Sequence, residues 1–161
     1  HESPRRGENF ISRKTILGII KVLKGHQKCL FLGNLDSKRD WGHAKEYVEG
    51  MWKMMQTKTP LDLILATNKS YTVKEFIENA FKEINVEIKW IGKDLKEKGI
   101  NKKTGEICVV VDKKYYRPNE LHYLKGNPQK ALKYLKWKPK INFKNLIKEM
   151  VHSDIEKFKN G

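Results

Sequence analysis

Two stretches in the first third of the chain carry apolar residues three and four positions apart, a spacing that places them on one face of a helix. The first stretch predicts a helix over residues 11–24, which Gly25 would end. The second stretch predicts a helix over residues 44–56. Its apolar residues are Tyr47, Val48, Met51, Trp52 and Met55.

N-terminal capping signals mark three further helices. Thr72 and Glu75 form a Thr-x-x-Glu capping box, in which each side chain bonds a backbone N–H group that the helix leaves free. Asn127-Pro128 and Asn142 match the residue preferences at helix starts. These signals predict helices over residues 72–84, 127–136 and 142–159.

Short apolar runs between these helices predict strands. The runs cover residues 29–33, 61–67, 86–92 and 107–112, whereas the polar, glycine-containing stretch 93–106 is predicted to be a loop. Helices and strands thus alternate, which is typical of the α/β class. The strands are few for a self-sufficient doubly wound sheet, and the sequence has no Gly-x-Gly-x-x-Gly turn. We therefore expect the second part of a larger α/β protein, in which a strand such as 61–67 completes the sheet of another part.

The net charge of +15 over 161 residues raises nucleic-acid binding as an alternative function. Only five of the 34 basic residues are arginines, and the lysines spread along the whole chain. Many fall on the predicted solvent sides of helices, as do Lys144, Lys148, Lys157 and Lys159. This pattern favours solvated helix faces. A non-enzymatic basic domain, with steeply salt-dependent binding to polynucleotides, is kept as the alternative hypothesis.

The spacing of the cysteines and histidines indicates neither a metal site nor a required disulfide. Cys29 and Cys108 lie in apolar runs, so we expect reduced core residues of a cytoplasmic protein, with a disulfide between them left open. His26, His122 and His152 show no metal-ligand spacing with these cysteines, and no metal is expected. No apolar run reaches the roughly 18 residues of a membrane span, so no membrane association is expected.

The five arginines stand in three short segments. A guanidinium grips phosphate or carboxylate with two parallel hydrogen bonds, which an ammonium cannot do. The arginines are Arg5, Arg6, Arg13, Arg39 and Arg117. Their distribution indicates a phosphate-bearing ligand, with surface arginines placed by chance as the alternative.

Three segments together resemble a known family. They are HESPRRGENFISRK, LGNLDSKRDWGHAKEYVEGMW, and VDKKYYRPNE followed by KALKYLKWKP. The sequence resembles the GDP-mannose 4,6-dehydratases, which are extended short-chain dehydrogenases/reductases, and the resemblance runs in order to the final segment FKNLIKEMVHSDIEKF. RDW followed by a helix is shared by nucleotide-sugar dehydratases and epimerases, whereas SPRRG and YYRPNE narrow the resemblance to the GDP-mannose branch.

The resemblance implies that residues 1–161 form a single C-terminal nucleotide-sugar-binding region. It is the substrate-binding part of an extended short-chain dehydrogenase/reductase, a Rossmann-type α/β fold, without the N-terminal dinucleotide-binding half. In the implied reaction NADP⁺ takes hydride from C4 of GDP-mannose, water leaves across C5 and C6, and the hydride returns to C6. The product is GDP-4-keto-6-deoxy-mannose, a precursor of GDP-fucose. The resemblance also implies a homo-oligomer, a dimer or a tetramer, for the whole enzyme.

The same resemblance implies contacts to the cofactor from the first residues of the chain. His1 and Arg6 match positions that contact NADP, and Arg6 would neutralise a phosphate. Arg5 and Arg13 are left open as surface or subunit-contact residues.

Four further positions match substrate-binding residues of the family. Lys14 matches a basic residue that faces the nucleotide, and Arg39 matches the arginine that grips the diphosphate. Arg117 and Glu120 match residues around the ribose and phosphates of GDP, where a carboxylate can accept two hydroxyl groups. The alternative for Lys14 is an ordinary helix lysine.

The resemblance places the catalytic groups outside this chain. The family's glycine-rich turn, its Thr and Glu acid/base groups and its Tyr-x-x-x-Lys pair precede the matched segments, so no catalytic residue is assigned and the chain alone is predicted to be inactive. Tyr134-x-x-x-Lys138 has the spacing of that pair but stands at a helix end, and we reject it. A split enzyme, in which a separate chain carries the cofactor-binding half, is a further hypothesis.

Overall fold

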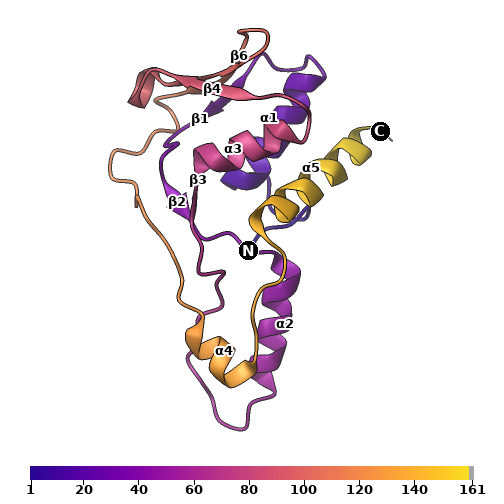
Figure 1. The fold of residues 1–161 in the computed structure, drawn as a ribbon, viewed down its shortest axis with the longest axis vertical. Coiled ribbons are helices and arrows are strands. Elements are labelled where there is room, and N and C mark those ends of the chain that lie inside the picture. Colours follow the sequence, from indigo (N-terminus) through magenta and orange to yellow (C-terminus); the bar gives the residue numbers. More distant parts are fainter. Residues whose placement is uncertain (160–161) are drawn as a thin grey trace.

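The computed structural model describes residues 1–159 and confirms the α/β class (Figure 1). The helices are α1 (Ile11–Leu23), α2 (Ala44–Met55), α3 (Val73–Lys82), the 3-10 helix η1 (Asp94–Lys96), α4 (Gln129–Leu135) and α5 (Phe143–Lys159). The strands are β1 (Leu30–Leu32), β2 (Lys38–Arg39), β3 (Tyr71–Thr72), β4 (Ile88–Ile91), β5 (Lys98–Asn101) and β6 (Ile107–Val111). Within the described residues, no helix is long and apolar enough to cross a membrane.

The main sheet has four strands in the order β1-β6-β5-β4, with β1 parallel to β6 and the other pairs antiparallel. The prediction of a loop over residues 93–106 is wrong, because β5 lies within it. β5 has a polar sequence, but it is hydrogen-bonded to β4 on one side and to β6 on the other. Pairing within the sheet therefore outweighs the local composition. Gly99 permits this, since a Cβ atom there would lie 3.0 Å from the side chains of Ile88 and Trp90.

The predicted strand over residues 61–67 is also not formed. The segment carries the alternating pattern of a strand, but it forms no ladder with any strand of the described chain. A strand requires a neighbour, and the four-stranded sheet is built elsewhere. Leu63 and Leu65 instead pack their side chains against a small cluster formed by Ala131, Leu135 and Trp137.

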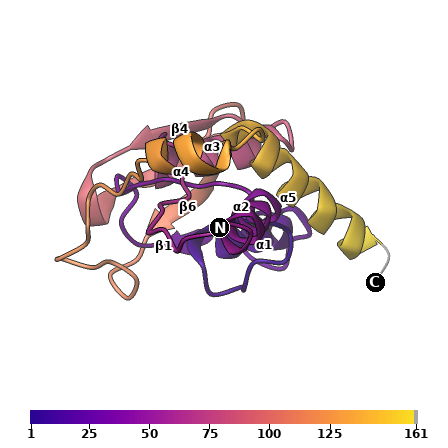
Figure 2. The ribbon, with the colours of Figure 1, turned by 90° about the horizontal axis from the view of Figure 1, so that it is seen from below.

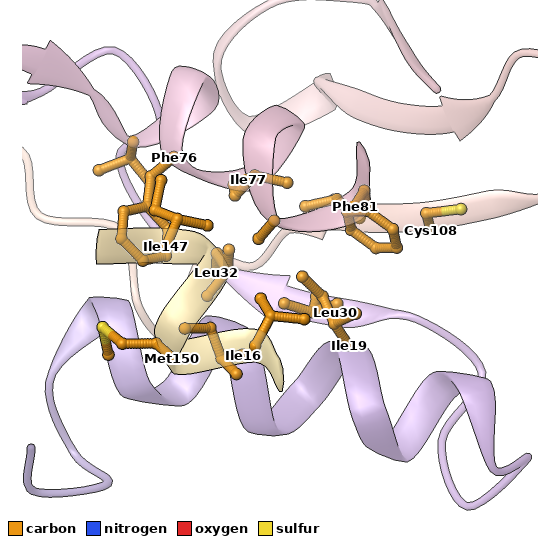
Figure 3. Packing of buried hydrophobic residues seen from close by; sticks show 14 of the residues in the cluster. Ile16, Ile19, Leu30, Leu32, Phe76, Ile77, Phe81, Cys108, Ile147 and Met150 are labelled. Carbon is orange, nitrogen blue, oxygen red and sulfur yellow. The ribbon is translucent and has the colours of Figure 1, made fainter. Parts of the chain in front are cut away.

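The main core lies between one face of the sheet and the helices α1, α3 and α5 (Figure 1). Figure 3 shows Ile16 and Ile19 of α1 facing Leu30 and Leu32 of β1, with the α3 residue Phe76 and other side chains above them. All five of these residues are at most 2% exposed. Helices α2 and α4 form the lower end of the molecule around the second, smaller cluster.

Capping groups begin the helices where the sequence predicts. In the capping box, the Glu75 N–H group donates to Thr72 Oγ1 at 3.0 Å and the Thr72 N–H group donates to the Glu75 carboxylate at 2.6 Å. Asn142 Oδ1 accepts from the Asn145 N–H group at 2.9 Å. At α4 the register differs by one residue: Pro128 is itself the N-cap and does not occupy the first helical position.

Four lysines of α5 are exposed, whereas Arg13 of α1 is buried. Lys144, Lys148, Lys157 and Lys159 are exposed, as the solvated helix faces predicted from the sequence require. Arg13, which was left open as a surface or subunit-contact residue, is instead buried and forms an ion pair with Asp154 of α5. The reason is local geometry: α1 and α5 pack together, and a long side chain on α1 reaches the buried carboxylate.

Removing one partner of this buried pair leaves an uncompensated charge in the core. We therefore predict that Asp154→Ala lowers the free energy of unfolding by about 3 kcal/mol or more in urea denaturation. The double replacement Arg13→Met with Asp154→Leu should recover most of that loss, because it removes both charges. Equal losses in the single and double variants would show that packing, and not the orphaned charge, accounts for the cost.

Candidate functional site

A cleft of about 510 Å³ opens between the start of α1, the end of β1 and the connection that follows β6. This connection is the orange segment on the left of Figures 1 and 2. The cleft is lined by all four residues that the resemblance assigned to the substrate: Lys14, Arg39, Arg117 and Glu120. Segments more than 100 residues apart in the chain thus supply one site.

Lys14 differs from an ordinary surface lysine. Its Nζ lies 3.2 Å from the centroid of the Tyr115 ring, a cation–π contact that fixes the ammonium at the cleft. Burial lowers the pKa of Lys14 and Lys114 lowers it further, whereas Asp112 opposes the shift. The side chain also lines an adjoining cavity of about 700 Å³ beside Leu17 and Phe31.

Arg39 stands on β2, which pairs with β3, and its guanidinium is held by three acceptors. Nη1 donates to the carbonyl oxygens of Lys38 at 2.8 Å and Leu121 at 2.7 Å. Nη2 donates to Glu120 Oε1 at 2.7 Å. A phosphate in the cleft would therefore meet a guanidinium whose orientation is already set, and would share it with Glu120.

Arg117 is the more exposed of the two arginines that line the cleft. Its side chain is 79% exposed, and Nη1 lies 3.9 Å from Glu120 Oε2. Its backbone is fixed: the Arg117 N–H group donates to Asn34 Oδ1, and Asn34 Nδ2 donates back to the Arg117 carbonyl oxygen, both at 2.9 Å. At Gly33 the chains approach so closely that a Cβ atom would lie 2.0 Å from the Tyr115 carbonyl oxygen.

The carboxylate of Asp40, in the RDW segment, joins three parts of the chain. Oδ1 accepts from the Thr67 N–H group at 2.9 Å and from the Thr67 hydroxyl. Oδ2 accepts from the N–H groups of Asn68 at 3.0 Å and Gly126 at 3.2 Å. Asp40, Asn34 and Gly33 were not predicted as site residues, although all three lie in the segment LGNLDSKRDW.

The two residues assigned to the cofactor do not line the cleft. The His1 ring packs against Tyr47 of α2, with the two rings tilted by 36° and their centroids 4.0 Å apart. The Arg6 guanidinium lies 3.3 Å from the centroid of the Phe10 ring, and its Nε lies 3.5 Å from the carboxylate of buried Glu2. Nε is buried without a hydrogen-bond partner within the described residues.

The charges that meet at the cleft favour an anionic ligand. Lys14, Lys114, Arg39 and Arg117 line it, against the single carboxylate of Glu120. Tyr134 and Lys138 are not among the lining residues. Over residues 1–159, no group of three His, Cys, Asp or Glu residues could hold a metal ion.

His43, Cys29 and Cys108 occupy structural positions. His43 caps α2, because its Nδ1 accepts from the Lys45 N–H group at 3.1 Å, and its Nε2 lies 3.1 Å from the Glu149 carboxylate. Cys29 and Cys108 are buried free thiols, and burial raises the pKa of both.

Solved structures share this fold. The chain superimposes on RMD from Pseudomonas aeruginosa, solved with NADPH, with a TM-score of 0.76 at 18% identity over 97% of this chain and 46% of that one. It superimposes on dTDP-glucose 4,6-dehydratase from Bacillus anthracis, solved with NAD, with a TM-score of 0.70 at 16% identity over 98% of this chain and 43% of that one. The fold is that of the extended short-chain dehydrogenases/reductases.

Sequence comparison narrows the class to one family. Residues 1–150 match the family model described as GDP-mannose 4,6 dehydratase. The GDP-mannose 4,6 dehydratase of Dictyostelium discoideum is 50% identical over 161 residues, which are 100% of this chain and 45% of that protein. The human protein of the same name is 50% identical over 156 residues, 97% of this chain and 42% of that protein. The chain belongs to the GDP-mannose 4,6 dehydratase family, and it spans less than half the length of these relatives.

Asp40 provides a direct test of how the site is held together. In Asp40→Asn only one oxygen can accept, so at least two of the bound donors lose their partner. We predict that the free energy of unfolding falls by about 2 kcal/mol or more in urea denaturation. Asp62→Asn is the matched control, because Asp62 is exposed, and it should leave the free energy unchanged. An Asp40→Asn variant as stable as the control would contradict the role given to this carboxylate.

Proposed function

We propose that this chain forms the substrate-nucleotide site of a GDP-mannose 4,6-dehydratase. The whole protein would convert GDP-mannose to GDP-4-keto-6-deoxy-mannose. The observation that supports this most strongly is the convergence of Lys14, Arg39, Arg117 and Glu120 on one cleft. These residues come from three separate segments, and nothing in their spacing along the chain requires them to meet.

The roles within the cleft follow from the chemistry of each group. Arg39 would grip the diphosphate from a fixed position, Arg117 would add a second charged donor to the phosphates, and Lys14 would face the nucleotide. Glu120 can accept hydrogen bonds from two ribose hydroxyl groups. Its contact with Arg39 keeps the carboxylate at the cleft before a ligand arrives.

The first residues of the chain fit the family's cofactor, NADP. The guanidinium of Arg6 and the imidazole of His1 are donors suited to a phosphate. Glu2 and Phe10 hold the Arg6 side chain in place, so its remaining donors are oriented. When bound, NADP⁺ supplies the acceptor and later the donor of the hydride.

The whole protein would contain a second, dinucleotide-binding half. Its dinucleotide-binding half, either in the same chain or in a separate one, would carry the Tyr and Lys that move the proton of the C4 hydroxyl group. The 161-residue chain alone should then show no turnover. We also propose a homo-oligomer and, because both thiols are free, a cytoplasmic location. The basic nucleic-acid-binding alternative gains no support, since lysines such as Lys144 and Lys148 are dispersed over helix surfaces.

The test of activity uses the whole protein with GDP-mannose and NADP⁺. Mass spectrometry of the sugar nucleotide should show the loss of one water and a keto group that borohydride reduces. UDP-glucose should be left unchanged. Conversion of neither compound by a folded protein that binds NADP⁺ would overturn the proposed reaction.

The test of the site is a GDP titration by calorimetry. Arg117→Ala should weaken GDP binding by about 2 kcal/mol, a roughly 30-fold rise in Kd, because a charged hydrogen-bond donor to the diphosphate is lost. Its exposed side chain makes a folding defect a poor explanation for such a loss. Arg5→Ala, an arginine outside the cleft, is the matched control and should leave Kd unchanged. Equal affinities of the two variants would show that the assignment of the diphosphate site is wrong.

A further inference from the structure

Lys14 lies at the boundary between two cavities of the surface. It lines the cleft of about 510 Å³ that holds Arg39 and Arg117, and it also lines the adjoining cavity of about 700 Å³. Among the lysines of residues 1–159, Lys14 is the only one that lines both. A small molecule in either cavity therefore has access to its side chain.

The Lys14 side chain stands on a fixed part of the fold. Its backbone N–H group donates to the Phe10 carbonyl oxygen at 2.8 Å, in the first turn of α1, and its neighbours Arg13 and Thr15 are buried. Its Nζ lies 3.2 Å from the centroid of the Tyr115 ring. Because the helix turn is fixed and the amine packs on a ring, a molecule bound in the cleft meets Nζ in a defined position.

The surroundings of Lys14 favour the neutral amine. Burial lowers the pKa of Lys14, and Lys114 lowers it further, whereas Asp112 opposes the shift. Such a lysine carries a larger neutral fraction at neutral pH than an ordinary lysine, and only the neutral amine has the free electron pair that attacks a carbonyl carbon. Lys21, two turns further along α1, is exposed, whereas Lys14 is half-buried. Of these two α1 lysines, Lys14 therefore has the environment of a nucleophile.

The arginines of the cleft select a reagent that carries a phosphate. Arg39 is held in place by three acceptors, and Arg117 is 79% exposed at the same cleft. Guanidinium groups bind phosphate oxygens through paired hydrogen bonds, and a positive cleft raises the local concentration of small anions. An acyl phosphate joins a phosphate directly to a reactive carbonyl group. When the arginines bind its phosphate, the carbonyl carbon enters the cleft that Lys14 lines.

We propose that Lys14 is a modification site, at which an acyl phosphate transfers its acyl group to Nζ. The neutral amine attacks the carbonyl carbon, a C–N bond forms, and the C–O bond to the phosphate breaks. Inorganic phosphate leaves with the electron pair, the amine gives one proton to water, and the side chain becomes an amide. The arginines stabilise the charge that develops on the leaving phosphate. The proposal rests on the proposed function for the role of the cleft as a phosphate site.

Acylation at this position would switch the nucleotide site off. An amide is neutral, so the acylated side chain loses its charge toward the nucleotide and its cation–π contact with Tyr115. A bound nucleotide in turn occupies the arginines and excludes the acyl phosphate. We therefore expect Lys14 to be acylated in the empty protein and protected in the nucleotide-bound protein.

Two other lysines provide internal comparisons. Lys114 lines the same cleft but is exposed, and its Nζ lies 5.7 Å from the centroid of the Tyr115 ring. Lys21 lies on the same helix as Lys14 and lines the cavity of about 700 Å³, which has no arginine in its lining. If exposure alone decided the reaction, both lysines would be acylated before Lys14.

The test treats the whole protein with acetyl phosphate and follows each lysine by mass spectrometry of its peptides. Lys14 should be acetylated about tenfold faster than Lys21 and Lys114, because the arginines hold the reagent beside it. Saturating GDP should suppress the acetylation of Lys14 and leave that of Lys21 unchanged. A rate at Lys14 no higher than that at Lys21, or acetylation of Lys114 in its place, would overturn the proposal.

Arg117→Ala separates recognition of the phosphate from the reactivity of the amine. It should slow the acetylation of Lys14 by acetyl phosphate about tenfold, because a charged hydrogen bond to the reagent is lost. Acetylation of Lys14 by the uncharged N-hydroxysuccinimide ester of acetic acid should not be slowed. Arg5→Ala, an arginine outside the cleft, is the matched control and should slow neither reaction. Equal rates at Lys14 in the two variants with acetyl phosphate would overturn the proposal.

Lys14→Arg tests the effect of the modification on the site. Treatment with acetyl phosphate should raise the Kd of the unmutated protein for GDP about tenfold, because a charged partner of the nucleotide is lost. Lys14→Arg has no amine to acetylate at this position, so its own Kd should be the same before and after treatment. An equal rise in both proteins would assign the effect to other lysines and overturn the proposal.

GDP titration of the untreated samples keeps the modification site apart from the proposed function. GDP binding without selective acetylation of Lys14, or without suppression of that acetylation by GDP, would overturn the modification site and leave the substrate site standing. Selective acetylation of Lys14 that depends on Arg117, in a folded protein that does not bind GDP, would support the modification site while the proposed nucleotide site fails.

Discussion

The site depends on the carboxylate of Asp40. Its two oxygens accept hydrogen bonds from Thr67, Asn68 and Gly126, so one side chain joins the end of β2 to two connections that have no regular structure of their own. These partly buried or exposed bonds give backbone N–H groups of irregular segments a partner within the protein. Because Gly126 is fixed, the connection that carries Arg117 and Glu120 is anchored at its far end.

The near end of that connection is anchored by Asn34, which exchanges two hydrogen bonds with the backbone of Arg117. Between these anchors the chain passes α1, so Lys14 and Arg117 face the same cleft. Arg39 is oriented by backbone carbonyl oxygens before any ligand binds. Fixed donors lose little conformational entropy on binding, and a site of this kind is therefore suited to a polyanion such as a diphosphate.

Local signals in the sequence predicted the helices well, because caps such as Thr72 and the apolar spacing of α1 act within a few residues. The two wrong predictions concern strands, because a strand forms only when it pairs with a segment that can be far away in the sequence. Residues 93–106 contain β5, which is stabilised from both sides by other strands, and residues 61–67 lack any neighbour. The substrate residues came from the resemblance to a family. Asp40 and Asn34 were missed since a side chain that bonds distant backbone leaves no periodic pattern.

We propose that the cleft binds the GDP part of a sugar nucleotide. It is tested most directly by NMR of the ¹⁵N-labelled chain during a titration with GDP, following the guanidinium Nε–H signals and the backbone amides. We expect saturable shifts at Arg39 and Arg117 and at amides around Lys14 and Glu120, with the α4 amides unchanged. Saturable shifts confined to other surfaces, or no shifts at millimolar GDP with the fold intact, would contradict it.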